Sequence, residues 1–169
     1  MTVDELNTLP EPRATDAFTA CCAAPRWVSR MVCERPFAGR AALLDTADAA
    51  WHELSRDDWM PAIAHHPRIG GSELAGAASA RARDWSAGEQ ASARAPDDST
   101  RAALAQANTD YERRFGHPFI ICATGKSASD VLVALRDRFV HEPSAELAVT
   151  ADELRKITML RLDKLLAGP

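Results

Sequence analysis

One histidine in this sequence stands directly before a proline, in the motif His66-Pro67-Arg68-Ile69-Gly70. Proline fixes its own φ at about −65° and disfavours a helical conformation in the residue before it. We therefore expect His66 at a rigid corner between a helix and a loop, with its imidazole projecting into a cleft. Because histidine changes protonation near neutral pH, it can both accept and return a proton. The alternative is that His66 caps the preceding helix or lies on the surface.

Glu89 has two interpretations that the sequence leaves open. It stands three residues after Ser86, which is the spacing of a capping box, and its carboxylate would then satisfy a backbone amide at the start of a helix. Alternatively, it holds the imidazole of a catalytic histidine or binds substrate amides. The next residue, Gln90, is either a contact for a substrate amide or a solvated helix residue.

A third candidate is Arg161, a charged residue on an otherwise apolar helical stripe. A buried guanidinium is costly unless it is paired. Arg161 therefore either meets an acidic side chain of the protein or grips a substrate carboxylate or ureide oxygen with its fork of N–H donors. The other members of the stripe are Leu147, Ala151, Leu154, Thr158 and Leu165.

The segment from Phe115 to Lys126 reads FGHPFIICATGK and combines a turn, an apolar run and a Gly-Lys ending. It lacks the spacing of a Walker phosphate loop, which argues against nucleotide binding. Its backbone amides either bind a small polar heterocycle, or the segment simply fills the core. Cys122 is an unpromising nucleophile, because an apolar setting raises the pKa of a thiol.

Composition excludes several classes of partner. The net charge of −4 and the pI of about 5.7 argue against nucleic acid, which needs a concentrated basic face. The five histidines and four cysteines show neither His-Glu-x-x-His nor Cys-x-x-Cys spacing, so we expect no metal. No apolar run approaches the roughly 20 residues that span a bilayer, and residues 1–11 do not resemble a secretory signal. These features favour a reduced, cytoplasmic protein.

The residues between these candidates predict helices. Phe119 to Ala123 is strand-like but has no partner run, so we expect buried extended chain there. The sequence therefore predicts an all-α bundle of about eight helices in one domain, residues 1–169, with 1–13 as a poorly ordered arm. Residues 73–85 form either a weak helix or a mobile connection. The helical patterns are 15–24, 25 to a stop at Arg35-Pro36, 40–54, 55–66, 86 to Pro96, 103–115, 127–139 and 145–166.

Five motifs in order along the chain resemble the OHCU decarboxylase family (2-oxo-4-hydroxy-4-carboxy-5-ureidoimidazoline decarboxylases). The resemblance spans nearly the whole sequence, although His117 replaces an expected apolar residue and 71–84 looks long for the family. The motifs are CCAAPRWVSRMVCERPF at 21–37, HHPRIG at 65–70, WSAGEQ at 85–90, FGHPFIICATGKSA at 115–128 and ELRKITMLRLDKL at 153–165.

The resemblance implies an all-helical homodimer that needs no cofactor and converts the small molecule OHCU to (S)-allantoin in urate breakdown. His66 and Glu89 would be catalytic. His66 would move the proton of the C4 hydroxyl, and Glu89 would fix the imidazole tautomer or bind amides. The residues that would bind substrate are Pro67, Gln90, Phe119, Ile120, Ile121, Cys122 and Arg161.

Two other functions compete with this interpretation. A hydrolase of cyclic ureides or amides would also use His66 with Glu89, or an unassigned metal. A non-catalytic helical adaptor would use its aromatic and arginine-bearing faces to bind another protein. Sensitivity to chelators would favour the first alternative, and a dry, buried His66–Glu89 pair with no adjoining cavity would favour the second.

Overall fold

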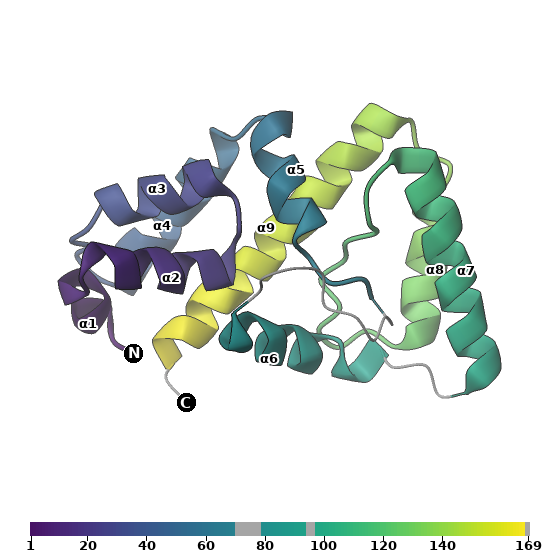
Figure 1. Cartoon of the computed structure of the whole chain (residues 1–169), viewed down its shortest axis with the longest axis horizontal. Coiled ribbons are helices and arrows are strands. Elements are labelled where there is room, and N and C mark those ends of the chain that lie inside the picture. Colours follow the sequence, from purple (N-terminus) through teal and green to yellow (C-terminus); the bar gives the residue numbers. More distant parts are fainter. Residues whose placement is uncertain (70–78, 94–96, 168–169) are drawn as a thin grey trace. The chain divides into compact units, whose positions relative to one another are not determined.

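The computed structural model describes residues 1–69, 79–93 and 97–167 (Figure 1). Within these ranges the secondary structure is entirely helical, which confirms the prediction of an all-α protein. No helix there is both long enough and apolar enough to span a bilayer. The α-helices are α1 (Val3–Thr8), α2 (Glu11–Cys21), α3 (Pro25–Cys33), α4 (Arg40–His52), α5 (Arg56–Ala64), α6 (Ala80–Glu89), α7 (Asp98–Phe115), α8 (Ala128–Arg138) and α9 (Pro143–Ala167), with a 3-10 turn, η1, at Ala91–Ala93.

The N-terminal residues are structured, contrary to the arm predicted for residues 1–13. Thr2 and Glu5 form a capping box at the start of α1, in which the Glu5 amide donates to the Thr2 hydroxyl at 3.1 Å. Leu6 is fully buried. Asn7 exchanges two hydrogen bonds with the backbone of Phe37, at 2.9 and 2.8 Å. The buried Leu6 and the side chain of Asn7 thus help to fix a segment that has no long apolar run.

The structure tests the helix starts that were predicted at residues 15 and 25. Pro25 occupies the first turn of α3, as predicted. The predicted start at residue 15 is wrong, because α2 already begins at Glu11 with Pro12 in its first turn. Proline suits that position because its missing N–H would have no partner there. The Thr15 hydroxyl instead donates to the Glu11 carbonyl at 2.9 Å, inside the helix.

The chain packs as two compact units. Unit 1 comprises Met1–Ala62 together with the residues from Arg155 onward, and unit 2 comprises Ile63–Leu154. Helix α9 therefore contributes its first half to unit 2 and its second half to unit 1.

Unit 1 is built around an aromatic centre. The ring of Phe18 meets those of Trp27 and Phe37 edge-on, with centroids 6.1 and 6.4 Å apart. The Trp27 indole N–H donates to the Ala47 carbonyl at 3.0 Å, which ties α3 to α4. The second half of α9 joins this unit partly through an ion pair between Arg155 and Asp48 at 2.6 Å. The part of the chain with the predicted Arg161 is thereby fixed to α4.

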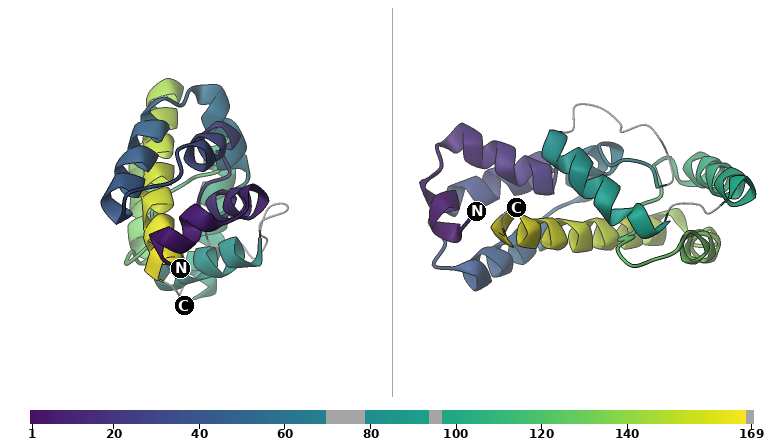
Figure 2. Two further views of the ribbon diagram at one scale, coloured as in Figure 1. Left: turned by 90° about the vertical axis from the view of Figure 1, so that its left-hand side faces the viewer. Right: turned by 90° about the horizontal axis from the view of Figure 1, so that it is seen from below.

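Unit 2 contains α7 and α8, which pack against each other and are seen end-on in the right-hand view of Figure 2. Gly116 ends α7 in the left-handed conformation, with φ of 75°, as its position predicts. A capping box of Ser127 and Asp130 starts α8, where the predicted helical pattern 127–139 begins. Between them, Phe119 to Ala123 forms neither helix nor strand, and Phe119, Ile120 and Ala123 are buried there. This buried connection carries the predicted substrate-binding segment.

Candidate active site

His66 follows the end of α5 and precedes a loop that unit 2 holds firmly. Helix α5 ends at Ala64, two residues earlier than predicted, and the His66 amide donates to the Ile63 carbonyl at 3.1 Å. The imidazole-bearing residue is half-buried and is followed by the half-buried Pro67. The expected corner at a helix end is therefore present.

Helix α7 anchors the residues just beyond His66. The Arg68 guanidinium makes a two-pronged ion pair with Glu112, at 2.5 and 2.6 Å. One turn earlier on the same helix, the Asn108 amide donates to the Ile69 carbonyl at 3.2 Å, and Asn108 is only 6% exposed. Because Asn108 and Glu112 lie four residues apart, both face the same loop. Sequence analysis did not single out either residue.

Glu89 is buried at the end of α6, and its position corrects the predicted capping box. Ser79, not Ser86, caps this helix, because the Ser79 hydroxyl accepts the Ala82 amide at 3.2 Å. Glu89 is therefore the last residue of α6 instead of lying in the first turn of a helix. It is 5% exposed, and the half-buried Gln90 follows as the C-cap. The predicted pattern ends at Pro96, which lies outside the described residues, as do residues 70–78.

Glu89 and Cys122, both in unit 2, are near enough for the Glu89 charge to act on the Cys122 thiol. Burial raises the pKa of the Cys122 thiol, and the nearby carboxylates of Glu153 and Glu89 raise it further. A protonated thiol is a poor nucleophile. The environment of Cys122 therefore agrees with the expectation that this residue does not act as one.

The backbone of this segment is held by charged side chains. The Arg138 guanidinium donates to the Ile120 carbonyl at 2.7 Å, and its carbon lies 4.5 Å from the centre of the Phe119 ring. The Cys122 amide donates to the Glu153 carboxylate at 2.8 Å. Phe119 is 1% exposed and packs in the core, so its side chain supports the segment from inside.

Arg138 belongs to a buried ionic cluster that the sequence analysis missed. Its guanidinium donates to Glu146 at 2.5 Å and to the Thr150 hydroxyl at 2.9 Å, and the Tyr111 hydroxyl also donates to Glu146. His141 meets the second Glu146 oxygen at 2.7 Å. The sequence did carry a signal for burial of Arg138, because Arg138 follows Val131 and Leu135 on the apolar stripe of α8. Arg161 occupies the same kind of position on the apolar stripe of α9.

Arg161 is buried on α9, as its stripe predicts, with 5% of its surface exposed. It belongs to unit 1, whereas His66, Glu89 and the segment Phe119–Cys122 belong to unit 2. Arg161 lies near Cys22. Burial raises the pKa of the Cys22 thiol to about 11, and the positive charge of Arg161 is one of the smaller effects that lower it.

Comparison with known proteins assigns the chain to a family. A family model described as OHCU decarboxylase matches residues 7–163. The chain belongs to the OHCU decarboxylase family. It is 28% identical to a 2-oxo-4-hydroxy-4-carboxy-5-ureidoimidazoline decarboxylase of Haloferax volcanii, over 96% of this chain and 94% of that protein.

Other relatives are longer than the matched region. A uric acid degradation bifunctional protein of Arabidopsis thaliana is 34% identical over 89% of this chain, which spans 46% of that protein. An OHCU decarboxylase of Amia calva is 35% identical over 62% of this chain, and the match covers 59% of that protein. The chain therefore spans about half the length of these two curated relatives.

The fold of the family agrees with the helices described above. A crystal structure of OHCU decarboxylase in the presence of (S)-allantoin superposes with a TM-score of 0.75 at 30% identity, covering 90% of this chain and 99% of the other. A crystal structure of (S)-allantoin synthase superposes with a TM-score of 0.72 at 19% identity, over 98% of this chain and 54% of the other, which shows the fold alone.

His117 departs from the apolar residue expected in the OHCU decarboxylase family, yet it is 6% exposed. Its Nδ1 lies 3.0 Å from the Pro118 carbonyl, and its ring packs edge-on against Tyr111 with centroids 5.6 Å apart. Its Nε2 has no hydrogen-bond partner among the residues described. The imidazole thus fills the place of an apolar side chain and satisfies one of its two nitrogens locally.

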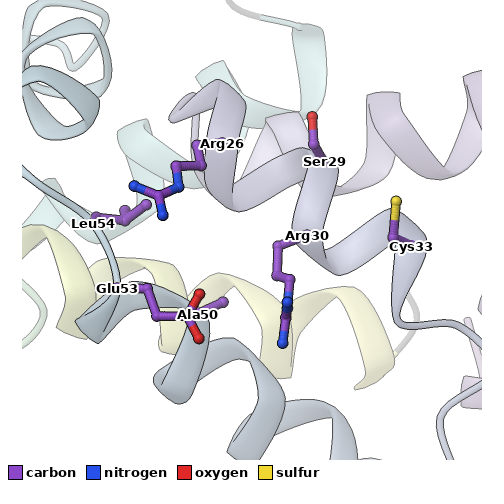
Figure 3. Close-up of a pocket in the computed structure, with 7 residues that line it drawn as sticks. All are labelled: Arg26, Ser29, Arg30, Cys33, Ala50, Glu53 and Leu54. Atoms are coloured by element: carbon purple, nitrogen blue, oxygen red, sulfur yellow. The ribbon is translucent and has the colours of Figure 1, made fainter.

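A cavity of about 330 Å³ in unit 1 is lined by none of the residues that the sequence predicted for the site. Figure 3 shows the arginines on its wall, Arg26 and Arg30, with Glu53 across from them. Both arginines have acidic partners, Asp58 at 3.3 Å and Glu34 at 3.0 Å. No group of three potential metal ligands occurs within the described ranges.

Proposed function

We propose that this chain is a carboxy-lyase that converts OHCU to (S)-allantoin during urate breakdown. The observation that carries the proposal is the family match over residues 7–163 combined with a histidine at a helix-end corner and a buried glutamate beside the segment Phe119–Cys122. The catalytic assignment of His66 and Glu89, and the binding assignment of Pro67, Gln90, Arg161 and the segment, are parts of this proposal.

The reaction needs no cofactor, because the substrate has its own electron acceptor. The bond between C4 and the carboxylate breaks, carbon dioxide leaves, and the electron pair of the broken bond forms a double bond between C4 and C5. The C5 imine electrons move to the ring nitrogen, which takes a proton. The resulting enol becomes a ketone when its hydroxyl loses a proton and C5 gains one. The protein has to orient the carboxylate, exclude water and move protons.

Each proposed residue has one task in this sequence. His66 removes or relays the proton of the C4 hydroxyl, for which an imidazole is suited near neutral pH. Glu89 fixes the imidazole tautomer or accepts hydrogen bonds from ring and ureido N–H groups. Arg161 binds the anionic side of the substrate through its planar fork of donors. Protonation of C5 from a single face in a rigid pocket would then give one enantiomer.

The decisive experiment makes OHCU freshly from urate with upstream enzymes and follows the optical activity of the allantoin. We expect the chain to accelerate formation of the (S) enantiomer. His66→Ala should reduce the rate at least about 100-fold, the contribution typical of general acid–base catalysis, while the helical circular dichroism stays unchanged. His65→Ala is the matched control, and it should keep its activity because adjacent side chains point in different directions. Racemic product at the spontaneous rate would remove the proposal.

We also propose a cytoplasmic homodimer. The four cysteines are free thiols, which suits a reducing compartment. Light scattering coupled to size-exclusion chromatography would measure the mass in solution. A monomer at micromolar concentration would contradict the dimer.

A further inference from the structure

The segment Phe119–Cys122 is held at two successive peptide groups by side chains from two helices. Arg138 of α8 donates to the Ile120 carbonyl at 2.7 Å. Glu153 of α9 accepts the Cys122 amide at 2.8 Å. Both contacts lie within unit 2. Together they fix the peptide groups on either side of Ile121.

These two contacts determine which way the backbone groups of Ile121 point. The peptide bonds before and after Ile121 are trans, and in a trans peptide the C=O and N–H point in opposite directions. The Ile121 N–H therefore points away from Arg138, and the Ile121 carbonyl points away from Glu153. Neither group has a hydrogen-bond partner among the described residues. Within the described part of the chain, one donor and one acceptor of Ile121 are therefore available to another molecule.

Arg138 is itself rigidly supported, so it can act as an anchor. Its guanidinium is tied to Glu146 and to Thr150, at 2.5 and 2.9 Å, and the side chains of Arg138 and Glu146 are 10% and 0% exposed. A lysine could keep the charge, but its ammonium cannot reach the carboxylate and the Ile120 carbonyl with the same planar geometry. The contact to Ile120 thus depends on arginine specifically.

We infer that Arg138 and Glu153 are positioning residues that hold the segment from behind, so that the Ile121 N–H and C=O face the substrate. The donor and the acceptor of Ile121 complement the C=O and N–H groups that an amide or a ureide carries. The inference rests on the proposed function for the identity of the substrate, and it assigns roles to two residues that were not among the site residues predicted from the sequence.

The test replaces the anchor but keeps its charge. Arg138→Lys should raise KM for OHCU about tenfold and leave kcat within about threefold, because weaker binding of ground and transition states alike changes KM alone. Arg136→Lys is the matched control, since Arg136 is exposed on the same helix. In parallel, hydrogen exchange of the peptide containing 119–122 should be faster in Arg138→Lys than in Arg136→Lys.

The second anchor gives an independent comparison. Glu153→Gln keeps an oxygen that accepts the Cys122 amide, whereas Glu153→Ala does not. We expect the alanine variant to raise KM about tenfold and the glutamine variant to remain within about threefold of wild type. Equal kinetics in the two variants would overturn the role of Glu153.

A variant that removes the buried pair separates positioning from folding. Arg138→Met alone leaves Glu146 buried without its cation, which is strongly destabilising, whereas removing both charges is often tolerated. Arg138→Met with Glu146→Gln should therefore fold and still show raised KM and faster exchange at 119–122. Wild-type KM and exchange in both this double variant and Arg138→Lys would overturn the inference.

The two proposals fail in different ways. If the wild-type chain does not accelerate (S)-allantoin formation, the proposed function falls. The exchange comparison between Arg138→Lys and Arg136→Lys still decides the anchoring, because it needs no substrate. Equal exchange at 119–122 would overturn the anchoring even in an active enzyme.

Discussion

The buried Arg138 is held in place by groups from neighbouring elements. In unit 2, Arg138 reaches a carboxylate, a hydroxyl and a backbone carbonyl, which replace the water it loses on burial. Such a network fixes the position of every member. Because Arg138 also donates to the Ile120 carbonyl, it holds the loop in place. The stability of the ionic cluster is therefore linked to the geometry of residues 119–122.

The cysteines make a prediction at the scale of single residues. Cys33 is exposed, whereas Cys21 and Cys22 are buried, and burial raises the pKa of Cys22 to about 11 and that of Cys122 above its ordinary value. Because the thiolate is the reactive form, an aromatic disulfide reagent at pH 7.5 should modify one thiol rapidly in the native protein. Cys33→Ser should abolish this fast phase. A fast phase that survives the substitution would show an unexpectedly reactive second thiol.

At the scale of elements, helix ends determine where the candidate residues lie. Ser79 begins α6, and Glu89 therefore falls at the buried end of that helix. Gly116 ends α7 and Ser127 begins α8, so the connection between them is free of helix. Caps thus decide both the place of the buried glutamate and the length of the connection between α7 and α8.

Two glycines give a matched test of these helix ends. A Cβ added at Gly116 or at Gly88 would meet nothing within 4 Å, but Gly116 alone of the two has a positive φ, 75°. Gly116→Ala should lower the free energy of unfolding by about 1–2 kcal/mol, the cost of a left-handed residue with a β-carbon. Gly88→Ala should raise it by about 0.5 kcal/mol through helix propensity. Urea denaturation measures both, and equal effects would contradict the φ argument.

At the scale of the whole molecule, α9 contributes to both units, because it supplies Glu146 and Glu153 to unit 2 and Arg155 and Arg161 to unit 1. Its buried polar residues are therefore spread along the helix and do not gather at one end. The Glu146 cluster is the part of this arrangement that responds to pH.

The stability of the protein should fall in acid because of Glu146. Burial alone raises the pKa of this carboxyl, but hydrogen bonds from Arg138, Tyr111 and His141 outweigh it and hold the pKa below the ordinary 4.5. A lowered carboxyl pKa contributes stability that is fully present above pH 4.5 and is lost as the pH falls through the folded-state pKa.

Urea denaturation at a series of pH values measures this dependence. The wild-type free energy of unfolding should decline below pH 4.5. Glu146→Gln should be less stable at pH 7 and decline less steeply in acid. Glu142→Gln, at an exposed position just before α9, should follow the wild type. A Glu146→Gln curve with the wild-type slope would contradict the assignment.

The sequence by itself determined most helices, the corner at His66 and the burial of Arg161. These features depend on neighbours within one or two turns: a proline that ends a helical conformation, a serine that caps, and an apolar residue every three or four positions. The same local information misplaced the start of α6, because Ser79 and Ser86 are both good caps and sequence spacing does not choose between them.

Tertiary structure alone decided which polar groups meet. Arg138 binds a carbonyl 18 residues away, and Glu153 accepts an amide 31 residues away. No local periodicity records such pairings, because they depend on how α8 and α9 pack against the connection between α7 and α8. The sequence thus predicted that the segment Phe119–Cys122 matters for the site. Packing decided that Arg138 and Glu153 support it and that the N–H and C=O of Ile121 point away from these two residues.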